Sequence, residues 1–210
     1  MKASDAYARL RRLRRPVIET ADAAAALQTS TVTASKTLSR LAESGLVAVV
    51  RHGTWWLDGP VEPYVLAGYL TAPFDGYLSL QTALHLRGMI EQIPEVHYVV
   101  SLARSQRVVT AMATFSIHHV APEVFGGYEE TPGGVRLATA EKALFDFAYL
   151  SAGRSRLFTA LPELTLPRGF RWSVLKSWVA KIPSDRSRTI TERKLEAFTR
   201  TPGLHGSRPR

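Results

Sequence analysis

Short hydroxyl side chains and two cations share the stretch between positions 30 and 40 of this sequence. Lysine and arginine neutralise phosphates or donate hydrogen bonds to guanine, while short hydroxyls and methyls approach base edges without blocking a groove. This combination is typical of a helix that reads double-stranded DNA. The residues expected to contact DNA are Ser30, Thr31, Thr33, Ala34, Lys36, Thr37 and Arg40.

A single helix from Thr31 to about Ser44 must carry these side chains. Ser30 or Thr31 is expected to cap its first turn, where the helix dipole also favours a phosphate, and Gly45 is expected to end it. Serine and threonine are poor helix formers, so packing must stabilise this helix. The face expected to pack inward is Val32, Ser35, Leu38, Leu41 and Ala42.

The neighbouring segments predict how this helix is held. A helix over Ser4–Leu13 and an alanine-rich helix from Thr20 precede it. Two apolar runs, "LVAVV" and "TWWLD", follow it and are typical of hairpin strands joined through "RHG". This order predicts a winged helix-turn-helix domain over residues 1–59.

The hairpin supplies further candidate contacts. Arg51 and His52 lie at its expected tip, beside Gly53, and could touch the minor groove or the backbone of DNA. Strand side chains alternate between faces, so Trp55 and Trp56 should face opposite ways, with one in the core and the other partly exposed.

A basic run in the first helix offers possible phosphate contacts at Arg11, Arg12, Arg14 and Arg15. These arginines could equally form a hydrated face, because charged helix faces are commonly just solvated. The whole domain could also serve protein contact or architecture, since one fold hosts many functions.

Charge is distributed unevenly along the 210 residues, whose net charge of +9 indicates an anionic partner. Residues 1–59 hold nine Lys or Arg against five Asp or Glu, residues 60–150 five against nine, and residues 151–210 thirteen against four. Together with the glycine and prolines of "DGPVEP", this predicts a boundary near residue 60, a second domain over residues 60–204 and a frayed tail over residues 205–210.

The second domain is expected to be of the α+β class, so the whole chain is α+β with a helical C-terminal part. The segments "HYVVSLA", "RVVTAM", "TFSIHHV" and "GVRLAT" are typical of strands and predict a small sheet of about four. Helices are expected in "SLQTALHLRGM", capped by Ser79, and in "TAEKALFDFAYL", capped by Thr139. Further helices are expected in "SRLFTALPEL", "WSVLKSWVAKI" and "TERKLEAFTR".

One group of titratable side chains in this domain is His118, His119 and Glu123. They could ligate a metal or transfer protons. Their spacing matches no familiar metal site, and successive residues of a strand face opposite ways. A partly buried, hydrogen-bonded histidine is therefore the simpler interpretation.

A second group is Glu141, Lys142 and Asp146, which could form a carboxylate and lysine cluster. A hydrogen-bond network that supports the helix explains them better. The chain has no cysteine, and it has no nucleophile elbow, phosphate-binding glycine loop, zinc-protease motif or paired-aspartate nuclease signature. We therefore expect no enzyme activity, no cofactor and no metal.

Four stretches of the chain together resemble a known family. They are "YLSLQTALHLRGMIEQIPEVHYVVS", "VAPEVFGGYEE", "GVRLATAEKALFDFAYL" and "LPELTLPRGFRWSVLKSWVAKI", and they resemble AbiEi-type antitoxins of type IV, abortive-infection toxin–antitoxin systems. The resemblance implies a winged helix that represses its own operon at inverted repeats, and a second domain that helps to counter a nucleotidyltransferase-like toxin. It places DNA reading on Thr33, Lys36, Thr37 and Arg40, and a family helix on Glu141, Lys142 and Asp146.

The expected function is therefore that of a DNA-binding transcriptional repressor and antitoxin. Its expected partners are an inverted-repeat operator and a nucleotidyltransferase-like toxin, with direct binding of the toxin left open. One alternative is a winged-helix regulator with a ligand-sensing second domain and no toxin, and another is a nucleic-acid-processing enzyme. Neither a signal-peptide core nor a run of roughly 18 apolar residues occurs, so a cytoplasmic protein without membrane contact is expected.

Overall fold

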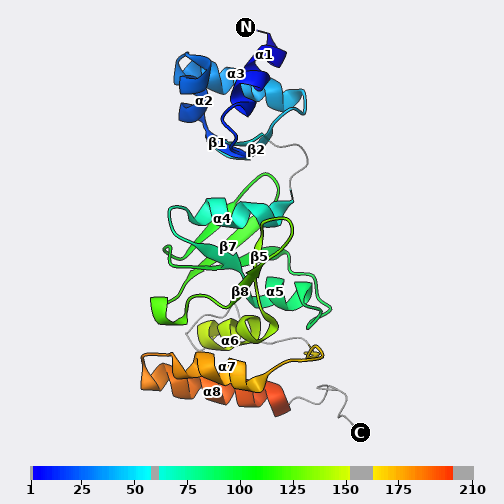
Figure 1. The fold of residues 1–210 in the computed structure, drawn as a ribbon, viewed down its shortest axis with the longest axis vertical. Helices are drawn as coiled ribbons and strands as arrows, with labels where there is room; N and C mark the ends of the chain where they lie inside the picture. The colour runs from blue at the N-terminus through cyan, green and yellow to red at the C-terminus, as the bar shows by residue number, and fades with distance from the viewer. Residues whose placement is uncertain (1, 58–61, 152–162, 201–210) are drawn as a thin grey trace. The chain divides into compact units, whose positions relative to one another are not determined.

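The computed structural model describes residues 2–57, 62–151 and 163–200 (Figure 1). The chain divides into two compact units: unit 1 is Met1–Pro63 with Val109–Ala113, and unit 2 is Tyr64–Val108 with Thr114–Arg210. Helices and two sheets make the chain α+β, as expected. No helix in the described ranges is long and apolar enough to cross a membrane. The expected tail over 205–210 and most of the expected helix in "SRLFTALPEL" lie outside the described residues.

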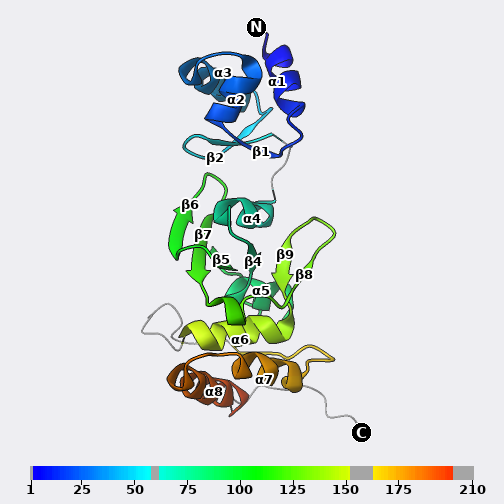
Figure 2. The ribbon, with the colours of Figure 1, turned by 60° about the vertical axis from the view of Figure 1, so that its left-hand side comes forward.

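Unit 1 places three helices on one side of a small antiparallel sheet (Figure 2). Its elements are α1 (Ala3–Arg11), β1 (Val17–Glu19), α2 (Thr20–Leu27), α3 (Thr31–Glu43), β2 (Ala48–Arg51) and β3 (Thr54–Trp56). The strand order is β1-β3-β2, so β3 is central. The expected helix over Ser4–Leu13 begins at Ala3 and ends at Arg11, so it starts one residue and ends two residues earlier than expected; Arg14, with a positive φ of 50°, lies beyond its end.

A single apolar core joins the helices and the sheet of unit 1. Leu10 of α1, Ile18 of β1 and Leu38 of α3 are among its fully buried members. The alanines of α2 present a smooth surface, which allows α2 and α3 to pack closely. Short side chains in α2 are thus what brings α3 against the rest of the unit.

The expectation for the two tryptophans is wrong in one respect. Trp55 belongs to the core, as one of the pair should, but Trp56 is just as buried, and each is 6% exposed. Strand alternation predicts that the two rings face different ways, and Trp56 indeed lies outside the core cluster. Alternation predicts which face of the strand each ring is on, but not how far other parts of the protein bury that face.

Unit 2 contains a mixed sheet of six strands rather than about four, in the order β6-β7-β5-β4-β9-β8. The strands are β4 (Gly76–Leu78), β5 (Val96–Ser101), β6 (Gln106–Val109), β7 (Thr114–His119), β8 (Tyr128–Glu130) and β9 (Arg136–Ala138). The unexpected strands are β4 and β8. Each has only three residues, too few for an alternating pattern alone to predict a strand; β9 is equally short, and it was expected from the longer segment "GVRLAT".

Helices cover and extend this sheet. They are α4 (Leu66–Thr71), α5 (Leu80–Leu86), α6 (Ala140–Ser151), α7 (Trp172–Ala180) and α8 (Asp185–Arg200), with 3₁₀ turns at Pro63–Val65 and Pro122–Val124. Within unit 2, α6 lies between the sheet and the α7–α8 pair (Figure 1). Every residue from Glu141 to Ala148 is therefore buried, including the three charged side chains Glu141, Lys142 and Asp146.

The two expected caps in unit 2 behave differently. The hydroxyl oxygen of Thr139 accepts a hydrogen bond of 3.2 Å from the Lys142 backbone N–H, as expected for a cap at the start of α6. Ser79 stands at the corresponding position of α5 but makes no capping bond. Its hydroxyl donates to Asp146 instead, at 2.7 Å, so its role is to join α5 to α6.

The packing around α6 leaves no room for a side chain at Gly127. A β-carbon there would lie 2.7 Å from Cζ2 of Trp178 and 3.0 Å from Cγ of Lys142, and φ is +73°. Gly169 has a φ of +87° but would meet nothing within 4 Å. The left-handed backbone costs an alanine about 1–2 kcal/mol at either site. Gly127→Ala should lose a further ~1–3 kcal/mol of unfolding free energy from overpacking.

Urea unfolding of Gly127→Ala and of Gly169→Ala, measured in parallel, separates the cost of the left-handed backbone from the cost of overpacking. Equal losses in the two variants would show that the approach of Trp178 to Gly127 is not a packing constraint.

Candidate nucleic-acid interface

The buried face of α3 consists of Ala34, Leu38 and Leu41, each with no exposed surface. Val32 was expected to pack inward and Ala34 to contact DNA, and both expectations are wrong: Val32 is 65% exposed. Helical geometry explains the difference. Val32 and Leu41 are separated by about 2.5 turns and face opposite ways, whereas Ala34 and Leu41 are separated by just under two turns and face the same way.

The start of α3 is fixed by its cap. The Thr33 backbone N–H donates to the Ser30 hydroxyl oxygen at 3.2 Å, and the two hydroxyl oxygens lie 3.0 Å apart. Ser30 is therefore the cap, and Thr31 is the first helical residue. The Thr37 hydroxyl donates to the Thr33 carbonyl at 2.9 Å, so this donor is engaged within the helix.

A hollow of about 670 Å³ lies between α3 and the β2–β3 hairpin. Its lining is rich in hydroxyls and cations and includes three apolar side chains. The residues are Thr31, Val32, Ser35, Lys36 and Ser39 from α3, Val49, Arg51, His52, Gly53 and Trp55 from the hairpin, and Thr20 from the start of α2. Among the described residues, no acidic side chain belongs to this lining. The hollow thus carries positive charge on both of its walls.

The hairpin wall is tied to α2. Thr20 donates its hydroxyl to the Gly53 carbonyl at 3.2 Å and accepts a hydrogen bond of 2.9 Å from the indole N–H of Trp55. The Thr20 backbone N–H donates to the same carbonyl at 2.9 Å. Gly53 has a φ of +78°, which the tight turn beside His52 requires. The tip that carries Arg51 and His52 is therefore held in place relative to α3.

The expected contact residues fall into three groups. Thr31, Lys36, Arg51 and His52 line the hollow. Ser30, Thr33, Thr37 and Arg40 do not line it. Ser30 is exposed at the cap position, Thr33 and Arg40 are exposed on the adjoining side of α3, and Thr37 is half-buried. Ala34 is buried and contacts no solvent. The sequence interpretation missed Val32, Ser39 and Val49, and also Ser35, which was expected to pack inward but is half-buried and lines the hollow. The seven-residue spacing of Ala34 and Leu41 could have corrected the orientation of the helix.

The arginines of the first helix do not line the hollow. Arg11 donates from Nη1 to the Leu57 carbonyl at 3.2 Å, which joins α1 to the end of the hairpin. Arg12, Arg14 and Arg15 are exposed. Arg11 thus has a structural role, and phosphate contact by the other three stays a prediction, because their side chains are exposed.

In unit 2, Lys142 and Asp146 form an ion pair with no solvent exposure. The Lys142 ammonium also donates to the Val124 carbonyl at 2.7 Å and lies 4.7 Å from the ring centroids of Phe145 and Trp178. Burial lowers the pKa of Lys142 and raises the pKa of Asp146, and in each case the partner's charge opposes the shift. A substrate cannot reach this pair, so it is a structural network.

Glu141 does not join that pair. Its carboxylate accepts a hydrogen bond of 2.9 Å from the backbone N–H of Arg171, the residue that precedes α7. The expected cluster of three is therefore a pair and a separate capping carboxylate. Both arrangements hold α6 to its neighbours, as the hydrogen-bond interpretation proposed.

The two histidines of β7, His118 and His119, have different hydrogen-bond partners and do not form one site. His118 is half-buried, its Nε2 lies 2.9 Å from the Ser116 hydroxyl oxygen, and burial lowers its pKa. His119 is exposed, and its Nδ1 lies 3.1 Å from the Leu102 carbonyl oxygen. Glu123 is exposed in the turn that follows β7. Across the described parts of the chain, no three histidine or acidic side chains are grouped to hold a metal ion.

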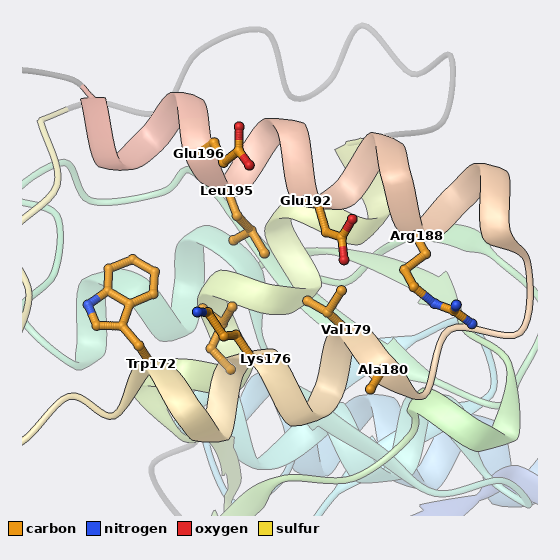
Figure 3. A pocket seen from close by; sticks show the side chains of 9 residues that line it. Trp172, Lys176, Val179, Ala180, Arg188, Glu192, Leu195 and Glu196 are labelled. Atoms are coloured by element: carbon orange, nitrogen blue, oxygen red, sulfur yellow. The ribbon is translucent and has the colours of Figure 1, made fainter.

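A second hollow, of about 910 Å³, lies between α7 and α8 (Figure 3). Leu175, Val179 and Leu195 form its buried floor. Its other lining residues are Trp172, Lys176, Ala180, Arg188, Glu192 and Glu196. Charges of both signs surround an apolar floor, and none of the expected site residues lies here.

No model of a known protein family matches the chain, and no curated protein matches it.

The buried ion pair gives a prediction about stability. Lys142→Met leaves the Asp146 carboxylate buried without its cation and should cost ~3–5 kcal/mol of unfolding free energy. The double variant Lys142→Met/Asp146→Asn buries no charge, and the introduced amide oxygen can still accept from Ser79 and Tyr77. It should therefore be more stable than the single variant.

Urea denaturation followed by circular dichroism measures both changes. A double variant as unstable as Lys142→Met would show that charge burial is not the origin of the loss.

Proposed function

We propose that this chain is a DNA-binding transcriptional repressor, and that residues 1–59 are a winged helix-turn-helix domain. In this arrangement α3 is the recognition helix and the β2–β3 hairpin is the wing. The proposed ligand is double-stranded DNA at an inverted repeat in the chain's own operon. The observation that carries the proposal is the hollow with Lys36 on its helix wall and Arg51 on its hairpin wall.

The charges of this hollow suit a phosphodiester backbone. A DNA strand that follows it would have cations on both sides, and the hydroxyls of Thr31, Ser35 and Ser39 can donate to phosphate oxygens. The helix can then enter the major groove while the hairpin tip reaches the neighbouring backbone or minor groove. Arg40, exposed on the adjoining side of α3, can contact the opposite strand.

The alternative of a protein-binding or purely architectural domain fits this surface less well. Interfaces between proteins favour aromatic and apolar side chains at their centre. Here the apolar members of the lining are few, and Trp55 is already buried in the core. Small hydroxyls and cations dominate the surface that remains accessible.

The second part of the proposal is antitoxin function, and it rests on the family resemblance of the chain. In this proposal unit 2 helps to counter a nucleotidyltransferase-like toxin encoded alongside. Because Lys142 and Asp146 are buried, the family helix would act by shaping unit 2 and would not itself touch the toxin. The accessible hollow between α7 and α8 favours one competing function, a ligand-sensing second unit without a toxin.

DNA binding is tested by removing one cation from each wall of the hollow. Lys36→Ala and Arg51→Ala should each weaken binding to the promoter upstream of the gene and each reduce the salt slope of log K by about 1. Arg186→Ala removes an exposed cation of unit 2 and is the control for net charge. Fluorescence anisotropy over a range of salt concentrations measures the slopes.

A wild-type chain that does not bind this DNA contradicts the proposal. So does a salt slope that Arg186→Ala lowers as much as Lys36→Ala does.

Antitoxin function is tested by growth. Co-expression of the full chain with the adjacent nucleotidyltransferase-like gene should restore growth that the toxin alone arrests. When both genes have unrelated promoters, the variant Lys36→Ala/Arg51→Ala should rescue as well as the wild type, because repression then has no part in the outcome. Failure of both proteins to rescue would remove the antitoxin part and leave DNA binding intact.

A further inference from the structure

Val32 is an apolar side chain in a place where the fold does not need one. It is the second residue of α3, is 65% exposed, and faces away from the core residues Ala34, Leu38 and Leu41. Valine is also a poor helix former, because its branched side chain loses rotamer freedom in a helix. Neither packing nor helix propensity therefore explains it.

The surroundings of Val32 are polar and cationic. Lys36 follows four residues later on the same side of α3, and both side chains line the hollow. Val49 of the hairpin, which is 38% exposed, belongs to the same lining. A ligand that suits this lining therefore presents negative charge to Lys36 and Arg51 and an apolar group at the position of Val32.

Duplex DNA has this combination at one kind of base pair. The edges of bases in the major groove are donors and acceptors, except for the C5-methyl group of thymine, which is apolar. The first turns of a recognition helix are the part that contacts base edges. We infer that Val32 is a specificity-determining residue that packs its methyl groups against a thymine methyl. This inference rests on the proposed DNA-binding function.

Val32 and Lys36 then have different tasks on the same face of α3. Lys36 contributes affinity through phosphate or guanine, whereas Val32 contributes discrimination between thymine and the other bases. Loss of Val32 should therefore change which sequences are bound more than it changes the salt dependence. A protein partner seated on Val32 would produce neither of these effects.

The test starts from duplexes of about 20 base pairs that the full-length wild-type chain selects from a random pool. Each thymine of the selected duplex is replaced in turn by deoxyuridine, which removes only the C5-methyl group. Binding is then measured for the wild type, Val32→Ala and Val32→Thr. Leu46→Ala is the matched control, since Leu46 is a 37% exposed apolar residue of unit 1 outside the hollow.

Deoxyuridine at one thymine of each half-site should weaken wild-type binding about fourfold, the effect of one buried methyl group. Val32→Ala should weaken binding to the unmodified duplex by about four- to tenfold and should no longer respond to deoxyuridine at that position. Val32→Thr, which keeps one methyl, should lie between them. Alanine is the better helix former, so a loss of affinity in Val32→Ala cannot come from a weaker helix.

Three results overturn the inference while DNA binding stands: a selected sequence with no required thymine, wild-type binding that no deoxyuridine weakens, or a deoxyuridine effect of equal size in Val32→Ala and Leu46→Ala. Absence of any selected duplex overturns the proposed DNA binding itself, and the role of Val32 with it.

Discussion

Asp146 accepts hydrogen bonds from three side chains that come from three parts of unit 2. Tyr77 belongs to β4, Ser79 stands before α5, and Lys142 lies one turn earlier on α6. An ionised carboxylate without such partners would be very costly to bury, so α6 can occupy the centre of the unit only when β4 and α5 are in place. The Lys142 ammonium extends this dependence to the turn at Val124 and to Trp178 of α7.

Unit 1 depends on a different constraint, which is the closeness of α2 and α3. Alanines remove side-chain bulk between the two helices, and Thr20 at the start of α2 binds the hairpin through Gly53 and Trp55. One short helix therefore sets the position of both walls of the hollow. The hydroxyl-rich α3 is a stable helix because Leu38 and Leu41 pack in the core. Its outward side chains are therefore free to bind a ligand.

The sequence predicts local features well where a single residue has a specific backbone role. Ser30 caps α3, Thr139 caps α6, and "RHG" forms the hairpin turn, because each depends on hydrogen bonds or φ values within a few residues. It predicts long-range features poorly. The strands β4 and β8 exist only through their partners, and Ser79 leaves its expected capping role because Asp146, 67 residues away, offers a stronger acceptor.

The orientation of α3 shows why a candidate site is harder to predict than the element that carries it. Valine, serine, leucine and leucine at positions 32, 35, 38 and 41 fit an inward stripe with a spacing of three, but such a stripe drifts around a helix of 3.6 residues per turn. The drift turns Val32 to the surface and Ala34 to the core. Apolar character alone therefore does not separate a core residue from a contact residue. In this helix the small residue, Ala34, packs in the core, and the branched apolar residue, Val32, is left exposed.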